Sequence, residues 1–305
     1  MNIGIDMGGT HTGIGLVEGL KIVAKTEFDT DISKGALEYA KTLAVKLKEF
    51  LTEQGLSLND IGTIGMGVPG SANKETGMVE YANNLGFENV PFKEYLSDEI
   101  GKPVELDNDA NLAALGEYLL SESKAKSFIM VTLGTGIGGG IIINGEIYRG
   151  INFAEGEIGH MTIKYDGIDC NCGRKGCFEA YASTNALVKM ACDKMRTNTA
   201  SRLWKYAEIS GKSVFSAAKE GDASVLSAID EYTDILSEGL TNIINIFQPE
   251  VLVIGGGISG AGDCFLPATI EKVQGKIYSK ASKKNTKIYA AKFGNDAGIV
   301  GAANQ

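Results

Sequence analysis

A glycine-rich segment near the start of the chain recurs in its middle, and this repeat constrains the fold more than any other feature. The two copies align without gaps at an offset of 126, with Ile3, Gly8, Gly13 and Gly19 opposite Ile129, Gly134, Gly139 and Gly145. Each copy reads as a buried strand, a glycine turn, a returning strand and a second turn. We predict an internal duplication of a β-hairpin with a glycine-rich tip. Chance similarity between two glycine-rich hairpins is the alternative.

Strands and helices alternate along the rest of the chain. Residues 33–54 carry apolar side chains at helical spacing, with Ser33 as the predicted N-cap. Further strands are predicted over 63–68, 104–106, 251–254 and 288–291, and further helices after Asp109, over 222–247 and after Gly298. This alternation predicts an α/β architecture.

The two hairpins predict two related lobes with a cleft between them. The boundary is expected near the Asp109 helix, so that residues 1–118 and 292–305 form a small lobe and residues 119–291 a large one. The pattern G-x-G-x-x-G occurs three times, but a dinucleotide fingerprint must follow a strand and open a helix. Only the copy at 255–260 could precede a helix, and no strand with an acidic ribose ligand is expected after it. We therefore do not expect a dehydrogenase.

Composition and charge exclude several classes of protein. The 305 residues carry a net charge of -9 and a sequence pI near 5.0, which argues against nucleic acid or an anionic membrane as partner. No apolar run approaches the ~18 residues of a spanning helix, and the N-terminus lacks the features of a signal peptide. Five cysteines with a metal-type spacing fit a reducing cytosol better than a disulfide framework, so a cytoplasmic protein is expected.

Residues 154–183 gather coordinating side chains with the spacing His-x9-Cys-x-Cys-x4-Cys. The four residues of this pattern are His160, Cys170, Cys172 and Cys177. Three thiolates and one imidazole form a standard closed set of tetrahedral zinc ligands. We predict a structural zinc in the loop 160–177, with no open position for water or substrate. Glu157 and Glu179 flank the cluster, and for either alone a solvated surface carboxylate is the alternative.

At Asp6-Met7-Gly8-Gly9-Thr10 the sequence resembles the actin/hexokinase nucleotide fold. The segments VPGSANKETG, NNLGF, DNDAN, LGTGIGGG, GEIGH and CNCGRKGCFEAYAS occur in the order of the ROK family of bacterial sugar kinases and related repressors. The resemblance covers essentially the whole chain. It implies a two-lobed actin/hexokinase-like (ribonuclease H-like) α/β fold in which both hairpins are phosphate loops. It also implies a homodimer, with its dimerisation surface on the large lobe.

The resemblance implies ATP with Mg²⁺ as the phosphoryl donor. The nucleotide contacts that it implies are Asp6, Gly8, Gly9, Thr10, Gly134, Thr135, Gly136, Gly256 and Gly257. Asp6 is expected beside Mg²⁺, directly or through water, because this ion prefers oxygen ligands and keeps several waters. A strand-end carboxylate that caps the turn is the alternative. His11 receives no role.

The resemblance also implies that Asp109 is the catalytic base, which takes the proton from a sugar hydroxyl. A carboxylate stabilised by the dipole at a helix N-terminus is the alternative, and it is compatible with that role. The sugar contacts that it implies are Gly70, Ser71, Asn84, Asn108, Asp109, Glu157, His160 and Glu179. We expect His160 to place one ring nitrogen on zinc and the other on a sugar hydroxyl.

We therefore expect an ATP-dependent kinase that phosphorylates the 6-hydroxyl of a hexose. Glucose is the first expectation, and N-acetylmannosamine or fructose is the alternative, because pocket shape decides which substituent fits. A sugar-sensing repressor of the same family would carry a helix-turn-helix before the first hairpin. That hairpin begins here at residue 3, so this class is disfavoured. A sugar-binding protein without catalysis is the remaining alternative.

Overall fold

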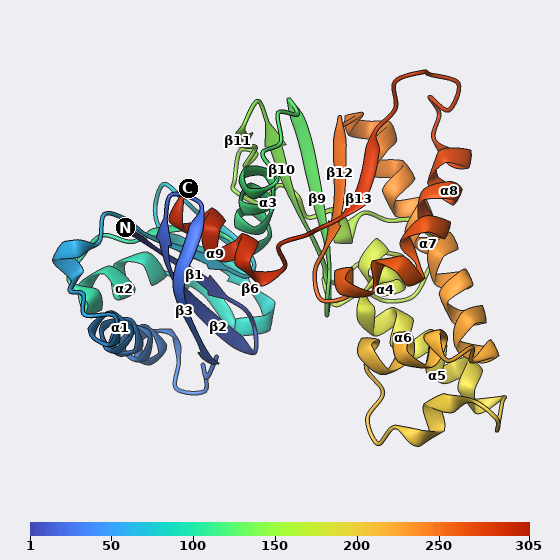
Figure 1. The fold of residues 1–305 in the computed structure, drawn as a ribbon, viewed down its shortest axis with the longest axis horizontal. Helices are drawn as coiled ribbons and strands as arrows, with labels where there is room; N and C mark the ends of the chain where they lie inside the picture. Colours follow the sequence, from blue (N-terminus) through green and yellow to red (C-terminus); the bar gives the residue numbers. More distant parts are fainter. The chain divides into compact units, whose positions relative to one another are not determined.

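The structure, a computed structural model, describes residues 1–305 and divides into two compact units (Figure 1). The first unit comprises residues 1–126, 140–156 and 292–305, and the second comprises residues 127–139 and 157–291. The chain therefore passes from one unit to the other four times. The lobe boundaries that we predicted at residues 118 and 292 stay a prediction.

The first unit is built on a five-stranded sheet with the order β3-β2-β1-β4-β8. Its strands are β1 (Asn2–Met7), β2 (His11–Glu18), β3 (Lys21–Asp29), β4 (Ile64–Val68) and β8 (Glu105–Asn108). The first three strands are antiparallel neighbours, whereas β1, β4 and β8 run parallel. A smaller sheet contains β5 (Ser71–Asn73), β6 (Met78–Ala82) and β7 (Phe87–Val90), and β11 (Glu146–Ile147) pairs with the end of β10 (Ile137–Ile143).

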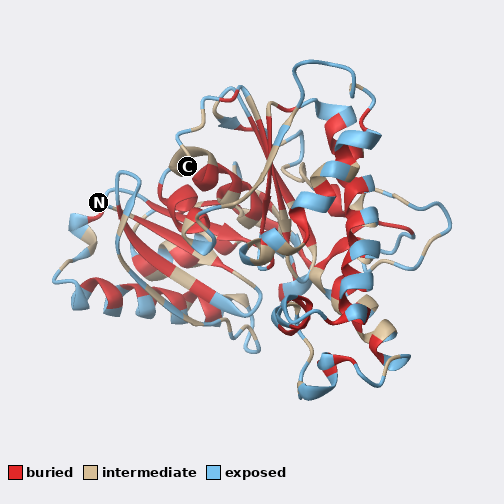
Figure 2. Cartoon of the chain, turned by 45° about the vertical axis from the view of Figure 1, so that its right-hand side comes forward, coloured by how far each residue is buried: buried red, intermediate tan, exposed pale blue.

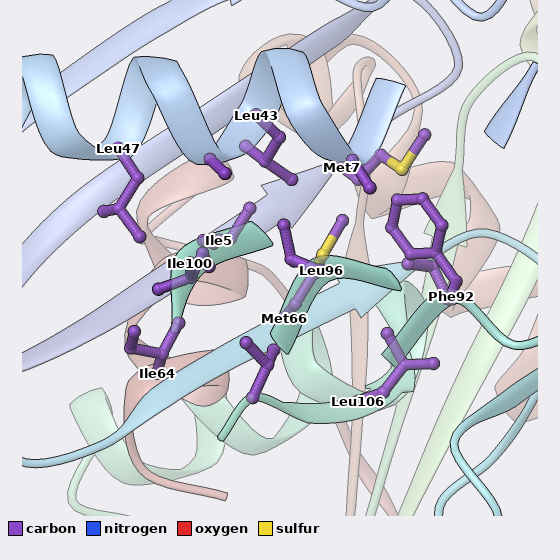
Figure 3. Packing of buried hydrophobic residues seen from close by; sticks show 14 of the residues in the cluster. Ile5, Met7, Leu43, Leu47, Ile64, Met66, Phe92, Leu96, Ile100 and Leu106 are labelled. Atoms are coloured by element: carbon purple, nitrogen blue, oxygen red, sulfur yellow. The ribbon is translucent and has the colours of Figure 1, made fainter. Parts of the chain in front are cut away.

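Helices cover both faces of this sheet. They are α1 (Ala36–Glu53), α2 (Phe92–Ile100), α3 (Asp109–Leu120) and α9 (Asn295–Ala303), and short 3-10 turns are η1 (Leu58–Asp60) and η2 (Asn83–Leu85). On one face, Leu43 and Leu47 of α1 pack with Phe92 of α2 over the strands (Figure 3). Truncating a fully buried leucine of this kind to alanine typically costs about 2–5 kcal/mol.

On the other face, α9 lies unusually close to the sheet and to α3. A Cβ atom at Gly4 of β1 would lie 1.9 Å from the carbonyl oxygen of Ile299, and one at Gly116 of α3 would lie 1.8 Å from that of Ala297. Real Cβ atoms do not approach an oxygen so closely, so both positions require glycine. The backbones of α3, α9 and β1 are therefore in direct contact.

The second unit contains three parallel strands, covered by helices, of a five-stranded sheet with the order β11-β10-β9-β12-β13. The strands are β9 (Ser127–Leu133), β12 (Val251–Gly255) and β13 (Lys287–Ala290), and β10 (Ile137–Ile143) begins in this unit. The helices are α4 (Phe178–Ala182), α5 (Thr184–Arg196), α6 (Gly211–Lys219), α7 (Ala223–Phe247) and α8 (Leu266–Lys276), with 3-10 turns η3 (Ile158–His160), η4 (Arg202–Lys205) and η5 (Ser259–Cys264). Buried and exposed residues alternate along α7 at the helical period (Figure 2).

The longest helix has defined chemistry at both ends. The Asp222 side chain caps α7 by accepting from the N–H groups of Ser224 and Val225, and the helix ends at Gln248 in the left-handed conformation. In the middle of α7, the buried Tyr232 donates its hydroxyl to the carbonyl of Ala182.

None of the helices combines the length and the apolar content that crossing a membrane requires.

Both predicted hairpins are present, as β1–β2 and β9–β10. Two predicted helix starts are wrong. The first helix begins at Ala36 behind Gly35, whose φ of 90° favours glycine, so Ser33 does not cap it. The last helix begins at Asn295 rather than after Gly298. Gly298 lies inside this helix, and a Cβ there would lie 2.8 Å from the carboxylate of Asp6.

Candidate active site and metal centre

Two predicted site carboxylates converge where the parallel strands of the first unit end. Asp6 of β1 is in register with Gly67 of β4, and Gly67 is in register with Asp107 of β8. A Cβ at Gly67 would lie 3.2 Å from the Cα of Asp109, so Gly67 lets the start of α3 approach the sheet. Burial raises the pKa of Asp6 to about 7, and the nearby charges of Asp109 and Glu27 act in the same direction.

Asp109 is held at the first turn of α3. Asn108 caps this helix, because its Oδ1 accepts the N–H of Asn111 at 3.0 Å. The Asn108 amide also donates to the carbonyl of Gly70 at 2.9 Å, which ties two predicted sugar contacts together. Asp109 Oδ1 accepts the N–H of Ala110 at 2.8 Å. The half-buried Asp109 carboxylate thus lies at a helix N-terminus, in a defined orientation.

The β1–β2 hairpin places three predicted nucleotide contacts at the same edge of the sheet. The N–H of Gly8 donates to the carbonyl of His11 at 2.8 Å and closes the turn through Gly9 and Thr10. A Cβ at Gly9 would lie 3.9 Å from the Cβ of Asn84, so a predicted sugar contact lies beside this turn. His11, which had no predicted role, points its Nδ1 at Asp29 Oδ1, 3.0 Å away on an exposed surface.

The β9–β10 hairpin has a corresponding turn in the second unit. The N–H of Gly134 donates to the carbonyl of Gly136 at 2.9 Å. A Cβ at Gly136 would lie 2.3 Å from Glu179 Oε2, so the glycine leaves room for this carboxylate as it is placed. The same oxygen accepts the N–H of Ile137 at 2.8 Å. The sequence did not predict this link between the β9–β10 hairpin, a predicted phosphate loop, and Glu179, a predicted sugar contact.

Gly256 brings the end of β12 against the same hairpin. It has a φ of 85°, and a Cβ there would lie 2.4 Å from the carbonyl oxygen of Leu133. Leu133 is the last residue of β9 and directly precedes Gly134. The predicted nucleotide contacts of the second unit, including Thr135 and Gly257, therefore lie at the carboxyl ends of adjacent parallel strands, where α/β sheets bind ligands.

The predicted metal ligands come together around one point. The ligand atoms of His160, Cys170, Cys172 and Cys177 all lie within 4.8 Å of one another. The Sγ atoms of Cys172 and Cys177 are 3.6 Å apart, and Cys170 Sγ is 3.7 Å from His160 Nδ1. Zinc–sulfur bonds of about 2.3 Å in a tetrahedron imply sulfur–sulfur distances of about 3.8 Å. The donor set and its spacing therefore fit a closed tetrahedral site.

The two nitrogens of His160 face different groups. Nδ1 points toward the sulfur atoms, and Nε2 lies 3.9 Å from Glu157 Oε2. Burial raises the pKa of Glu157, His160 opposes this effect and Glu179 adds to it. Burial among the other sulfur atoms raises the pKa of Cys177 to about 12. A metal ion would be needed to hold this thiol as a thiolate at neutral pH.

The structure distributes the predicted site residues over both units. The first unit holds Asp6, Gly8, Gly9, Thr10, Gly70, Ser71, Asn84, Asn108 and Asp109. The second unit holds Gly134, Thr135, Gly136, Glu157, His160, Glu179, Gly256, Gly257 and the three cysteines. Sequence reasoning missed one ion pair beside Asp109, in which Arg149 Nη2 lies 2.7 Å from Asp107 Oδ2. The signal for it was a second carboxylate, directly before Asn108, at the end of a buried strand.

Comparisons with known proteins converge on one family. The model of the ROK family matches residues 2–304. A glucokinase of Halalkalibacterium halodurans is 37% identical over 98% of this chain and 92% of its own length. A ROK family glucokinase from Streptomyces griseus, solved in complex with glucose and AMPPNP, has a TM-score of 0.87 at 30% identity, covering 99% of this chain and 98% of that one. A xylose repressor of Caldicellulosiruptor bescii is 36% identical over 78% of this chain and 60% of its own length.

Proposed function

The chain belongs to the ROK family, and we propose that it is an ATP-dependent kinase that phosphorylates the 6-hydroxyl of a hexose, with glucose as the first candidate. One observation carries this proposal. Asp6 and Asp109 converge at one edge of the first sheet, beside a glycine turn. Relatives named glucokinase, one of them solved with glucose and an ATP analogue, support the choice of substrates. N-acetylmannosamine and fructose are the alternative acceptors.

Asp109 is the proposed general base. Its carboxylate accepts the proton of the sugar hydroxyl as that oxygen attacks the γ-phosphorus, and ADP leaves. A loose phosphoryl-transfer transition state asks more of positioning than of base strength. The N-cap of α3 and the Asn108–Gly70 hydrogen bond supply this positioning. The amide of Asn108 is the proposed second contact to the sugar.

The glycine turn of each unit and Gly256 of the second unit are the proposed nucleotide contacts, because bare backbone amides can face phosphate oxygens. Mg²⁺, when bound, neutralises phosphate charge. Asp6 suits the role of its partner, because burial makes an unpaired carboxylate at this position costly. A cation nearby would favour the ionised form. Asp6 thus holds the ion, directly or through water.

Zinc is the proposed ion of the cysteine cluster, and its role is structural. Four protein ligands leave it no open position for water or substrate. The site holds the segment between Glu157 and α4, which carries Glu179, and so aims both carboxylates at the sugar. We also propose, from the resemblance alone, a cytoplasmic homodimer.

A coupled assay of ADP release over a panel of hexoses tests the proposal. We expect Mg-ATP-dependent turnover on at least one of glucose, N-acetylmannosamine and fructose. Asp109→Asn should fold normally and lose roughly 10²–10⁴-fold in turnover, the usual worth of acid–base catalysis. Asp98→Asn is the matched control, because Asp98 is exposed on α2. Absence of turnover on every hexose would overturn the kinase and favour a non-catalytic sugar sensor, as the similarity to a xylose repressor suggests.

A further inference from the structure

Residues 149–155 of the first unit hold the start of α3 at two points, and we call these two contacts the clamp. At one end of this segment, Arg149 donates from Nε and Nη2 to Asp107 Oδ2, at 2.8 and 2.7 Å. At the other end, Glu155 Oε1 accepts a hydrogen bond from the side-chain amide of Asn111 at 2.8 Å. The two residues that the clamp contacts are Asp107 and Asn111. In the sequence they flank the proposed catalytic base Asp109 and its neighbour Asn108.

These four side chains form one connected polar network. Asp107 Oδ1 accepts the N–H of Asn108 at 2.8 Å and lies 3.4 Å from the amide nitrogen of Asn111. Asp107 is 1% exposed and Asn111 is 2% exposed, so neither can exchange its partners for water. Buried polar networks fix geometry more tightly than surface contacts do, because any loss of a partner is costly.

We propose that Glu155 and Arg149 are positioning residues for phosphoryl transfer, which act through Asn111 and Asp107 to aim Asp109 and Asn108. This inference rests on the proposed function. Neither residue needs to touch the substrate. A misplacement of about 1 Å at a reacting group can cost on the order of 10²-fold in rate, so a clamp on the turn that carries the base has a measurable effect.

Glu155 has a chemical property that makes the clamp testable. Two buried oxygens of the network have no hydrogen-bond partner, Asn111 Oδ1 and Glu155 Oε2. Burial raises the pKa of Glu155, the hydrogen bond from Asn111 and the charge of Arg149 oppose this, and Asp107 adds to it. The neutral acid would bring one donor into a network that has two unpartnered acceptors. A glutamine reproduces that form, because it keeps an acceptor for Asn111 and adds an N–H donor.

The test compares three variants in the same assay. Glu155→Ala removes the clamp, Glu155→Gln keeps it, and Glu146→Ala is a control at an exposed position on β11, nine residues earlier in the same stretch of the first unit. We expect Glu155→Ala to lower kcat about 10–100-fold and to change the KM for ATP by less than about threefold. Glu155→Gln should keep kcat within about threefold of the wild type.

A merely structural role would give a different pattern. It would lower the unfolding midpoint of Glu155→Ala. The kcat of the folded fraction would stay unchanged, like the kcat of the control Glu146→Ala. That result, or a Glu155→Gln variant as slow as Glu155→Ala, would overturn the proposal. If the wild-type chain turned over no hexose, the proposed function itself would fall, and this inference with it. Wild-type turnover that Glu155→Ala leaves intact would remove only the clamp.

Discussion

Asp6→Asn should make the protein more stable above pH 7 when Mg²⁺ and nucleotide are absent, and it should abolish turnover with Mg-ATP. Burial raises the pKa of Asp6 from 3.8 to about 7, whereas in the unfolded chain it returns to its ordinary value. Between these two values the folded state binds more protons than the unfolded state. Stability therefore falls as pH rises through this window. Asparagine carries no charge and escapes this loss.

The size of the effect follows from the shift. Each pKa unit corresponds to about 1.36 kcal/mol, so a shift of about three units sets a ceiling of roughly 4 kcal/mol above pH 7. The Asp6 side chain is only partly covered, and solvent screens part of the cost. About half of the ceiling, roughly 2 kcal/mol, is the expected gain at pH 8. Near pH 4 and below, the difference should fall toward zero.

Urea unfolding at pH 4, 6 and 8 in buffer without Mg²⁺ and nucleotide, and with the proposed zinc left in place, measures this difference. Asp98→Asn, exposed on α2, controls for the change in net charge. Saturating Mg-ATP should reverse the order at pH 8, because it stabilises the wild type by binding and Asp6→Asn loses that contact. Equal midpoints at pH 8 without Mg²⁺, or an equal gain at pH 4 and pH 8, would refute the reasoning.

Three further perturbations test other parts of the structure. Cys172→Ala should lose zinc and sugar affinity together, in metal analysis and calorimetry, while Cys192→Ala keeps both; zinc loss with intact sugar binding would disprove that the zinc site aims Glu157 and Glu179 at the sugar. In thermal unfolding, Gly116→Ala should lower stability by about 3 kcal/mol, because its Cβ would lie 1.8 Å from a backbone oxygen of α9. Gly275→Ala, in open space on α8, should raise stability by about 0.5–1 kcal/mol in the same measurement. Asp222→Ala removes the cap of α7 and should cost about 2 kcal/mol at pH 7. Its pKa is lowered by hydrogen bonds that outweigh burial, so this difference should shrink as pH falls through the acidic range, and a constant difference would contradict the assignment.

Local sequence patterns predict the two hairpins, four further strands and the metal cluster, because each depends on residues close together in the chain. The strand β3 and the small sheet of β5, β6 and β7 were not predicted. The spacing of one histidine and three cysteines identifies the four candidate metal ligands that the structure brings together. Helix starts were less predictable. Ser33 is a good N-cap by type, but the sharp turn at Gly35 decides where the helix begins. Leu37 matches the apolar period of α1 and is nevertheless exposed, whereas Leu43 and Leu47 of the same helix are buried in the core.

Contacts between distant polar residues could not be predicted. Asn111 and Glu155 are 44 positions apart, and Glu179 and the N–H of Ile137 are 42 apart. No periodicity or short motif joins such pairs, since their approach depends on how whole elements pack. Glu155 reads in the sequence as one more acidic residue of a loop. Only its contact with a buried asparagine beside the proposed base gives it a role.

The helix α9 belongs to the first unit, although its residues follow the whole of the second unit in the sequence. During synthesis, residues 127–139 and 157–291 therefore leave the ribosome before residues 292–305. Until then, Gly4 and Gly116 have no helix against them, and a face of the first sheet stays open to water and to other chains. Domains of multidomain proteins generally fold from the N-terminus onward during translation. Here the unit that begins first can be completed only last, and its open face is the surface on which a chaperone would act.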